Sequence, residues 1–204
     1  MPRPVVLVSH DPAWAAQAEA LGAGVRAAGA GVFRAVHHMG STAIPGIPAK
    51  PVIDLLAEVE ALEAVEGAQA SLAALGWRWR GENGLVGRRY FTRDDPATGT
   101  RVAHLHVYAS GDPAITWHLA FRDRLRAEPA TAEAYAQEKA RCAALHPDDS
   151  AAYTACKQAW TDAVAAEAVR GVGIVGPRAE GRQSLISGTW KINGLEDVSA
   201  FPEI

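Results

Sequence analysis

The fold of this chain is decided by the stretch Gly40-Ser41-Thr42-Ala43-Ile44-Pro45-Gly46-Ile47-Pro48-Ala49-Lys50-Pro51-Val52-Ile53-Asp54. Three prolines and a glycine in its middle predict a structured loop that is not helical. The stretch begins with a small glycine-serine pair and ends with a carboxylate inside an apolar run. Backbone N–H and hydroxyl donors on a turn, followed by an acid on a strand, suit phosphate and a divalent cation held side by side. We therefore expect a phosphate-binding turn that leads into a buried strand.

The composition is that of an ordinary soluble globular domain. Of the 204 residues, 49% are hydrophobic and 21% are charged, which predicts one domain with a full-sized core. No apolar run approaches the roughly 20 residues of a membrane-spanning helix, so we expect no membrane partner. The N-terminal residues lack the pattern of a signal peptide. Cys142 and Cys156 are too few for a disulfide framework, so we expect buried free thiols and a cytoplasmic location.

The charge pattern limits the class of partner. A formal net charge of −3 argues against a protein that binds nucleic acid in bulk. A local basic cluster is nevertheless present, because six arginines fall within 24 residues: Arg78, Arg80, Arg88, Arg89, Arg93 and Arg101. One interpretation is a solvated hairpin surface. The other is a grip on a triphosphate or another acidic substrate, since arginine makes bidentate contacts with oxyanions.

Hydrophobic periodicity divides the chain into helices and strands. We expect helices over 13–28 and 60–75, and strands over 32–39, 52–59, 77–80, 86–92 and 101–108. Beyond Pro113 the pattern is helical to about residue 170, with one break near 146–149. This order indicates an α+β domain over residues 1–170 with a helical C-terminal third. Residues 171–204 lack periodicity, so we expect an irregular arm, packed on the body or on a partner in an oligomer, or a cloning remnant.

Three residues are candidates for catalysis and for metal binding. Asp54 lies in a buried strand, where an ionised carboxylate is costly without a partner. His104 and His106 lie two apart on another strand, so both imidazoles point to the same side. Two histidines and one carboxylate on one face suit a divalent metal such as Mg²⁺, Mn²⁺ or Zn²⁺. The alternative is that the histidines are hydrogen-bonded residues of a half-buried sheet.

A second set of residues is expected to contact the phosphate or the rest of a substrate. Ser41 and Thr42 are better suited to hydrogen bonding than to nucleophilic attack, because no Ser-His-Asp arrangement is readable in the sequence. Lys50 follows in the same loop, and an ammonium group there suits phosphate. The full set of expected binding residues is Gly40, Ser41, Thr42, Lys50, Arg89, Arg122 and Lys157.

With these residues in view, the chain resembles the GrpB family, which also occurs as the C-terminal domain of some dephospho-CoA kinases. The resemblance covers about residues 5–168 and is carried by five motifs: Asp11–Trp14, His38–Gly46, Ala49–Asp54, His104–Val107 and Phe121–Arg126. Supporting matches lie on the C-terminal helices, at Tyr135 with Lys139 and at Tyr153 with Lys157.

The GrpB family resembles the nucleotidyltransferase superfold, and this implies a mixed β-sheet flanked by helices. That superfold carries a Gly-Ser turn, a strand with two acids and a third acid on a neighbouring strand, which together hold two Mg²⁺ ions. Here Gly40, Ser41 and Asp54 match, whereas Leu56 stands at the second acid position. Histidines occupy the third position. The resemblance therefore implies an altered version of the two-metal site.

The resemblance and the residues together leave three functions open. The first is an enzyme that binds a nucleotide or phosphorylated small molecule and transfers a nucleotidyl or related group. The second is a binding or assisting module that keeps the fold without the chemistry. The third is a metal-assisted condensation or cyclisation in small-molecule metabolism. A fold alone does not choose among them.

Overall fold

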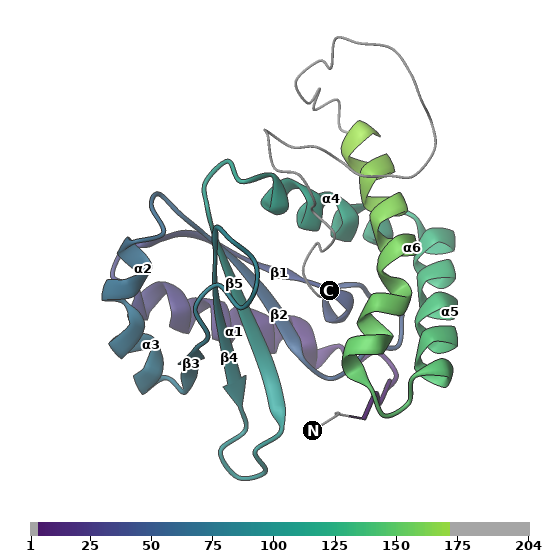
Figure 1. Ribbon diagram of the computed structural model, residues 1–204, viewed down its shortest axis with the longest axis horizontal. Helices are drawn as coiled ribbons and strands as arrows, with labels where there is room; N and C mark the ends of the chain where they lie inside the picture. Colours follow the sequence, from purple (N-terminus) through teal and green to yellow (C-terminus); the bar gives the residue numbers. More distant parts are fainter. Residues whose placement is uncertain (1–3, 172–204) are drawn as a thin grey trace.

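The computed structural model describes residues 4–171, so the arm expected over 171–204 lies outside this range except for Gly171. The elements along the chain are α1 (Ala13–Ala28), β1 (Phe33–Met39), a short 3₁₀ helix η1 (Ser41–Ala43), β2 (Ile53–Val59), α2 (Ala64–Gly67), α3 (Gln69–Ala74), β3 (Trp77–Trp79), β4 (Arg88–Asp94), β5 (Arg101–Ala109), α4 (Pro113–Ala127), α5 (Pro129–Leu145) and α6 (Ser150–Gly171) (Figure 1). None of the helices within this range is long and apolar enough to cross a membrane.

The five strands form one mixed sheet in the order β1-β2-β5-β4-β3. β2 and β5 run parallel, whereas the other three neighbouring pairs are antiparallel. The parallel pair places Asp54 beside His104 and Leu56 beside His106, so all four side chains lie on one face of the sheet. A mixed sheet flanked by helices, with a helical C-terminal third, is the α+β arrangement that the sequence and the resemblance predict.

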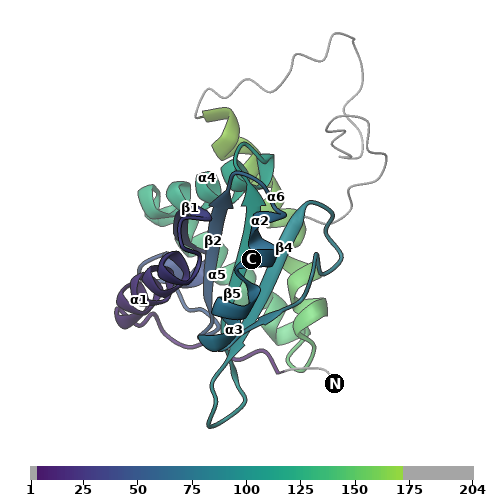
Figure 2. The ribbon, with the colours of Figure 1, turned by 90° about the vertical axis from the view of Figure 1, so that its left-hand side faces the viewer.

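Helices cover both faces of this sheet, as Figure 1 and Figure 2 show from two directions. On one face α1, α2 and α3 close a large apolar core, with buried side chains that include Trp14, Val25, Leu55, Leu72, Phe91 and Leu105. On the other face α4 packs on a smaller cluster formed by Met39, Leu56, Tyr108, Ala114 and Ile115. α5 and α6 pack on α4 through aromatic side chains, among them Trp117, Phe121, Tyr135 and Trp160. Alternate residues along a strand therefore face different helical layers.

The proline-rich loop between β1 and β2 is fixed by the C-terminal helices. Ile44 and Ile47 are buried in the aromatic cluster that α4, α5 and α6 share. Arg126 of α4 donates from Nε to the carbonyl oxygen of Ala43 at 2.8 Å. The loop is non-helical, as expected, apart from the single 3₁₀ turn at its start. These contacts place the beginning of the loop against the helical layer that faces Asp54.

Two helical expectations differ from the structure. Residues 60–75 form two short helices instead of one, with Ala68 between α2 and α3. The C-terminal helical region breaks at 146–149, as expected, but also at Glu128, which precedes Pro129 and has a non-helical backbone. A residue before proline is disfavoured in the helical conformation, which explains the second break.

The cysteines form a pair that the sequence does not reveal. Cys142 on α5 and Cys156 on α6 are joined by a disulfide bond, with their Cα atoms 5.8 Å apart. The expectation of two free thiols is therefore wrong. The turn at 146–149 folds α6 back along α5, which brings two residues 14 positions apart within disulfide range.

Candidate functional site

Asp54 and His104 form a hydrogen-bonded pair between β2 and β5. Oδ1 of Asp54 lies 2.9 Å from Nδ1 of His104, and the two side chains are 14% and 17% exposed. An ionised carboxylate only accepts hydrogen bonds, so Nδ1 of His104 carries the proton. The other ring nitrogen, Nε2, is then an acceptor whenever the imidazole is neutral. The structure thus brings an acid and an imidazole together on one face, with the imidazole oriented by the acid.

Gly40 lies directly against this pair. A Cβ atom built on Gly40 would lie 2.5 Å from Oδ2 of Asp54, closer than two such atoms can approach. The φ angle of Gly40 is also +70°, in the region that favours glycine. Glycine at this position therefore lets the turn touch the carboxylate. The two ends of the Gly40–Asp54 stretch meet in space.

A small pocket opens beside the pair. Its lining comes from the same stretch, from β5 and from α6: Ser41, Thr42, Lys50, Val52, Asp54, His104, Tyr153 and Thr154. Five of the expected site residues are among these. Sequence reasoning gives no pocket role to Tyr153 or Thr154. A signal was present for Tyr153, which precedes Lys157 by four residues and so shares a helix face with it.

The loop side of the pocket offers hydroxyl groups. Oγ of Ser41 lies 3.4 Å from the hydroxyl oxygen of Tyr135 on α5. Oγ1 of Thr42 lies 2.9 Å from Nε2 of His38, whose pKa is lowered to about 4 by burial. Neutral groups of this kind add hydrogen-bond donors and acceptors without adding charge.

Three lysines lie near one another beside this pocket: Lys50 of the loop, Lys139 of α5 and Lys157 of α6. The latter two are almost completely buried. Nζ of Lys139 donates to the carbonyl oxygen of Pro48 and lies 4.9 Å from the centre of the Tyr135 ring. Burial, together with the charges of Lys157 and Lys50, lowers the pKa of Lys139 to about 7. The region beside the pocket is therefore electropositive and suits an anion.

Two buried histidines adjoin the Asp54–His104 pair. One ligand atom from each of Asp54, His104 and His106 lies within 4.8 Å of the other two. The rings of His106 and His118 have centres 6.2 Å apart, and both residues are 1% exposed. Burial lowers the pKa of His106 well below its ordinary value and that of His118 to about 3. Within the described part of the chain, Nε2 of His106 and both ring nitrogens of His118 have no hydrogen-bond partner.

Sequence reasoning misses His118. It lies on α4 three residues before the buried Phe121, so helical spacing places it on the buried face of that helix. That spacing is the signal that could have found it, although burial alone does not distinguish a site residue from a packed one.

A family model described as GrpB protein matches residues 4–167. The chain belongs to the GrpB family. It is 47% identical over 126 residues to the UPF0157 protein YqkA of Bacillus subtilis, a match that covers 62% of this chain and 36% of YqkA. It is 31% identical over 182 residues to the dephospho-CoA kinase of Mycolicibacterium paratuberculosis, which covers 77% of this chain and 44% of the kinase.

A solved structure of the family has the same fold. The crystal structure of the conserved protein GrpB from Enterococcus faecalis matches with a TM-score of 0.76 and 34% identity. The match covers 82% of this chain and 99% of the Enterococcus chain. This GrpB chain therefore spans nearly all of that structure but only about a third of YqkA and less than half of the kinase.

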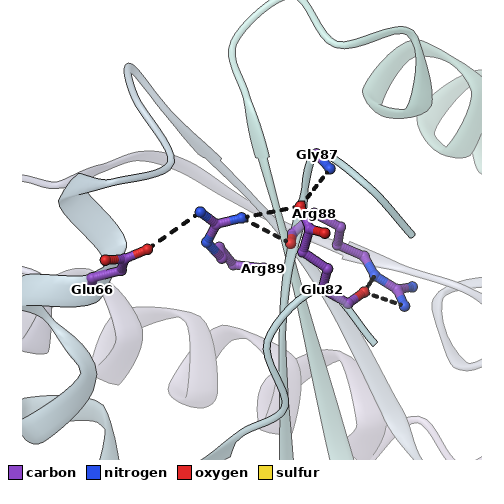
Figure 3. Close-up of polar contacts among 5 residues, drawn as sticks. All are labelled: Glu66, Glu82, Gly87, Arg88 and Arg89. Atoms are coloured by element: carbon purple, nitrogen blue, oxygen red, sulfur yellow. Dashed lines mark hydrogen bonds and ion pairs between the residues drawn. The ribbon is translucent and has the colours of Figure 1, made fainter. Parts of the chain in front are cut away.

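In this GrpB chain the structure does not bring Arg89 to the site. Arg89 lies on the face of the sheet that α1, α2 and α3 cover. Its guanidinium lies 3.3 Å from Oε1 of Glu66 and 3.5 Å from Oε1 of Glu82. Figure 3 draws both ion pairs. The preceding residue, Arg88, lies on the face of Asp54. Neighbouring residues of a strand face opposite sides of the sheet, so Arg89 does not lie at the pocket and its expected phosphate contact does not fit this position.

Arg122 contacts the loop instead of lining the pocket. Its Nη1 donates to the carbonyl oxygen of His38 at 3.0 Å, and its Nε donates to Asp123 at 2.7 Å. His38 is two residues before Gly40. Arg122 therefore holds the end of β1, from which the glycine turn starts, and its expected role as a direct phosphate contact does not fit this position.

Leu56, which the resemblance places at the position of a second acid, is fully buried among apolar side chains of β1, β5 and α4. The next residue on the same face, Glu58, is hydrogen-bonded to His37 at 2.9 Å. Of the residues that line the pocket, Asp54 is the only carboxylate. The described part of this GrpB chain therefore has no pair of acids for two metal ions at this pocket.

Proposed function

We propose that this GrpB domain binds a nucleotide or a phosphorylated small molecule and transfers its nucleotidyl group or a related group. The observation that carries the proposal is the contact of the Gly40 turn with the Asp54–His104 pair, at a pocket beside three lysines. The proposed phosphate-binding groups thus lie next to a carboxylate–imidazole pair that can move a proton.

The phosphate is bound by the loop side of the pocket. Ser41 and Thr42 contribute hydroxyls, and Lys50 contributes an ammonium group at the pocket wall. The buried Lys157, together with Lys139 in its protonated form, adds attraction for an anion, because both lie where water screens charge little. The pocket is small, with about 40 Å³ of space, room for about three water molecules. The remainder of the ligand lies toward solvent.

The reaction side of the pocket is the Asp54–His104 pair. Asp54 accepts from Nδ1 of His104 and so leaves Nε2 as the basic nitrogen. In the proposed reaction Nε2 removes a proton from the hydroxyl or amine that accepts the transferred group. The carboxylate then stabilises the imidazolium that forms, which is the usual function of an acid behind a catalytic histidine.

A divalent cation is an alternative use of the same site, because the lone pair of Nε2 of His104 serves either as the base or as a metal ligand. The ligand atoms of Asp54, His104 and His106 lie within 4.8 Å of one another. Imidazole and carboxylate ligands together suit Zn²⁺ or Mn²⁺ better than Mg²⁺, which prefers oxygen alone. When bound, such an ion would stabilise the negative charge that develops on the transferred group.

A second candidate function is a binding module without turnover. Leu56 in place of the second acid favours it, because a two-metal transfer site needs that carboxylate. The dephospho-CoA kinase relative matches over 44% of its own length, which is compatible with a module attached to another domain. In this case the pocket would bind the same class of ligand and leave it unchanged.

Isothermal titration calorimetry with the whole chain tests both candidates. ATP and CTP are titrated with and without Mg²⁺, Mn²⁺ or Zn²⁺, and release of pyrophosphate or phosphate is followed separately. We expect millimolar or tighter nucleotide binding that depends on the cation. Asp54→Asn should weaken it about tenfold or more, equivalent to about 1.4 kcal/mol.

Glu58→Gln is the matched control. It makes the same change from acid to amide on the same face of β2, at a residue bonded to His37 and outside the pocket lining. It should bind nucleotide as the unmodified chain does. Binding without any product would favour the module. No binding of nucleotide or cation at millimolar concentration would overturn the proposal.

A further inference from the structure

Arg88 is a buried cation whose guanidinium is fixed by the turn that precedes β4. Its Nε and Nη2 donate to the carbonyl oxygen of Glu82 at 3.3 and 3.2 Å, and Nη2 also donates to that of Asn83 at 3.0 Å (Figure 3 draws the Glu82 contacts). The guanidinium carbon lies 4.7 Å from the centre of the Tyr90 ring. Three hydrogen bonds and an aromatic face thus set the direction of the remaining nitrogen, Nη1.

Nη1 of Arg88 lies 3.4 Å from Nδ1 of His106. An arginine side chain has donors only, so Nδ1 of His106 must accept, with its lone pair toward the guanidinium. A neutral imidazole that accepts at Nδ1 carries its proton on Nε2. A second proton on this ring is opposed by burial and by the adjacent positive charge. The neighbourhood of His106 therefore selects one tautomer.

We infer that Arg88 is a positioning residue that fixes His106 as a hydrogen-bond donor at Nε2, next to Asp54 and His104, and thereby excludes His106 from the ligands of a metal ion. A metal binds an imidazole nitrogen through its lone pair. Nε2 of His106 holds a proton instead, and the lone pair of Nδ1 is taken by Arg88. The identity of the atom that accepts a hydrogen bond from Nε2 of His106 rests on the function proposed above.

The inference divides the three expected metal ligands into two roles. His104 is left to bind a cation through Nε2, because its Nδ1 is used by Asp54, which orients the ring. Nε2 of His106 is a buried donor without an acceptor among the described residues, which costs free energy until an oxygen atom arrives. The site thus favours a ligand with an oxygen acceptor there, a phosphate oxygen in the proposed function.

Arg89 is a matched control for Arg88. It is the next residue of the same strand and it contacts the same turn, through the Glu82 carboxylate. Its side chain lies on the opposite face of the sheet and pairs with Glu66. A change at Arg89 therefore alters the net charge by the same amount, also removes a contact with the turn, and leaves the surroundings of His106 intact.

The test is the tautomer of His106, read by long-range ¹H–¹⁵N correlation NMR of the imidazoles in the whole chain without ligand. His106→Gln identifies the signals by their loss. We expect the Nε2–H pattern in the unmodified chain, in Arg88→Lys, which keeps a donor, and in Arg89→Met. Arg88→Met should shift the pattern toward an averaged one, because no donor then holds Nδ1 as an acceptor. An Nδ1–H pattern or an averaged one in the unmodified chain would overturn the inference, and this reading does not depend on whether Arg88→Met folds.

Titration with Zn²⁺ or Co²⁺ adds a second reading. We expect His106→Gln to bind the ion within about twofold of the unmodified chain, and His104→Gln to bind it about tenfold or more weakly. Equal losses in both variants would overturn the inference. If no ion and no nucleotide binds, the proposed function fails, whereas the tautomer still decides the role of Arg88. The two proposals can therefore fail separately.

Discussion

The two faces of the sheet bury different kinds of side chain. The face under α1, α2 and α3 is closed by a continuous apolar cluster that runs from Trp14 to Leu105. The face under α4, α5 and α6 has two smaller apolar clusters and, between sheet and helices, buried polar groups: Arg88, His106, His118, Lys139 and Lys157. One face of the sheet thus stabilises the fold by apolar burial, whereas the buried polar groups on the other face cost free energy.

The difference teaches where to look for function. Removing an ionisable group from water costs free energy unless partners compensate for it. Here the partners are incomplete: His118 has none at either ring nitrogen within residues 4–171, and Lys139 has its pKa lowered to about 7. Groups with perturbed pKa values gather at functional sites more often than elsewhere. His106 shares the face of Asp54, His118 adjoins it, and neither these two histidines nor Lys139 belongs to the α1–α3 core.

The largest effect on stability is expected on the apolar face. Leu105→Ala removes a fully buried side chain from the core under α1 and α3 and should lower the free energy of unfolding by about 2–5 kcal/mol. Urea unfolding measures this. Val86→Ala, at a side chain 93% exposed, is the control and should change stability by less than about 0.5 kcal/mol. A loss below about 1 kcal/mol for Leu105→Ala would contradict the assignment of the stabilising face.

The next largest effect is expected where the polar face meets the loop. Gly40→Ala forces a Cβ against Oδ2 of Asp54 and places alanine at a φ of +70°. It should cost about 1–3 kcal/mol of stability and separate Asp54 from His104, with loss of ligand binding. Gly46→Ala isolates the backbone strain, because its φ is +81° and nothing lies within 4 Å of its Cβ. If both variants bind ligand equally well, the close approach at Gly40 is unimportant.

The sequence predicts the parts of this face that depend on one strand or one loop. The period of two within β5 places His104 and His106 together, and the proline-rich loop leads into the strand of Asp54, both as expected. The residues of β4 were harder to place. Arg88 and Arg89 are identical in type, and which of them faces Asp54 depends on the register between β4 and β5, which are joined by the turn at 95–100 and have an irregularity between Arg93 and Asp94.

Other features depend on packing between helices that no local pattern reports. Cys142 and Cys156 meet because α6 folds back along α5. The residues near either cysteine do not predict the angle between these two helices. Lys139 and Lys157 lie on the same two helices, so the packing of α6 along α5 also places these lysines beside the pocket. The sequence identifies these residues as candidates but does not orient them.

The pH dependence of stability tests the burial of Lys139. The folded chain releases its proton near pH 7, whereas the unfolded chain holds it to about pH 10.5. Between these values the unfolded state binds more protons, so stability from this group rises with pH, by up to about 1.4 kcal/mol per pH unit. Urea unfolding at pH 7, 8 and 9 measures the slope. Lys139→Met should make the profile flatter, and an unchanged slope would contradict the pKa near 7.

The smallest effect is expected at His118, and its sign is informative. Both ring nitrogens are buried and without partners in the described residues, so the imidazole loses its hydration and gains nothing in return. His118→Leu keeps a side chain of similar size and removes both polar atoms, which should leave stability unchanged or raise it by about 1 kcal/mol. Thermal and urea unfolding measure the change. A clear loss of stability would mean that His118 has a hydrogen-bonded water or ligand as its partner, and the polar face would then be less costly than the comparison with the apolar face indicates.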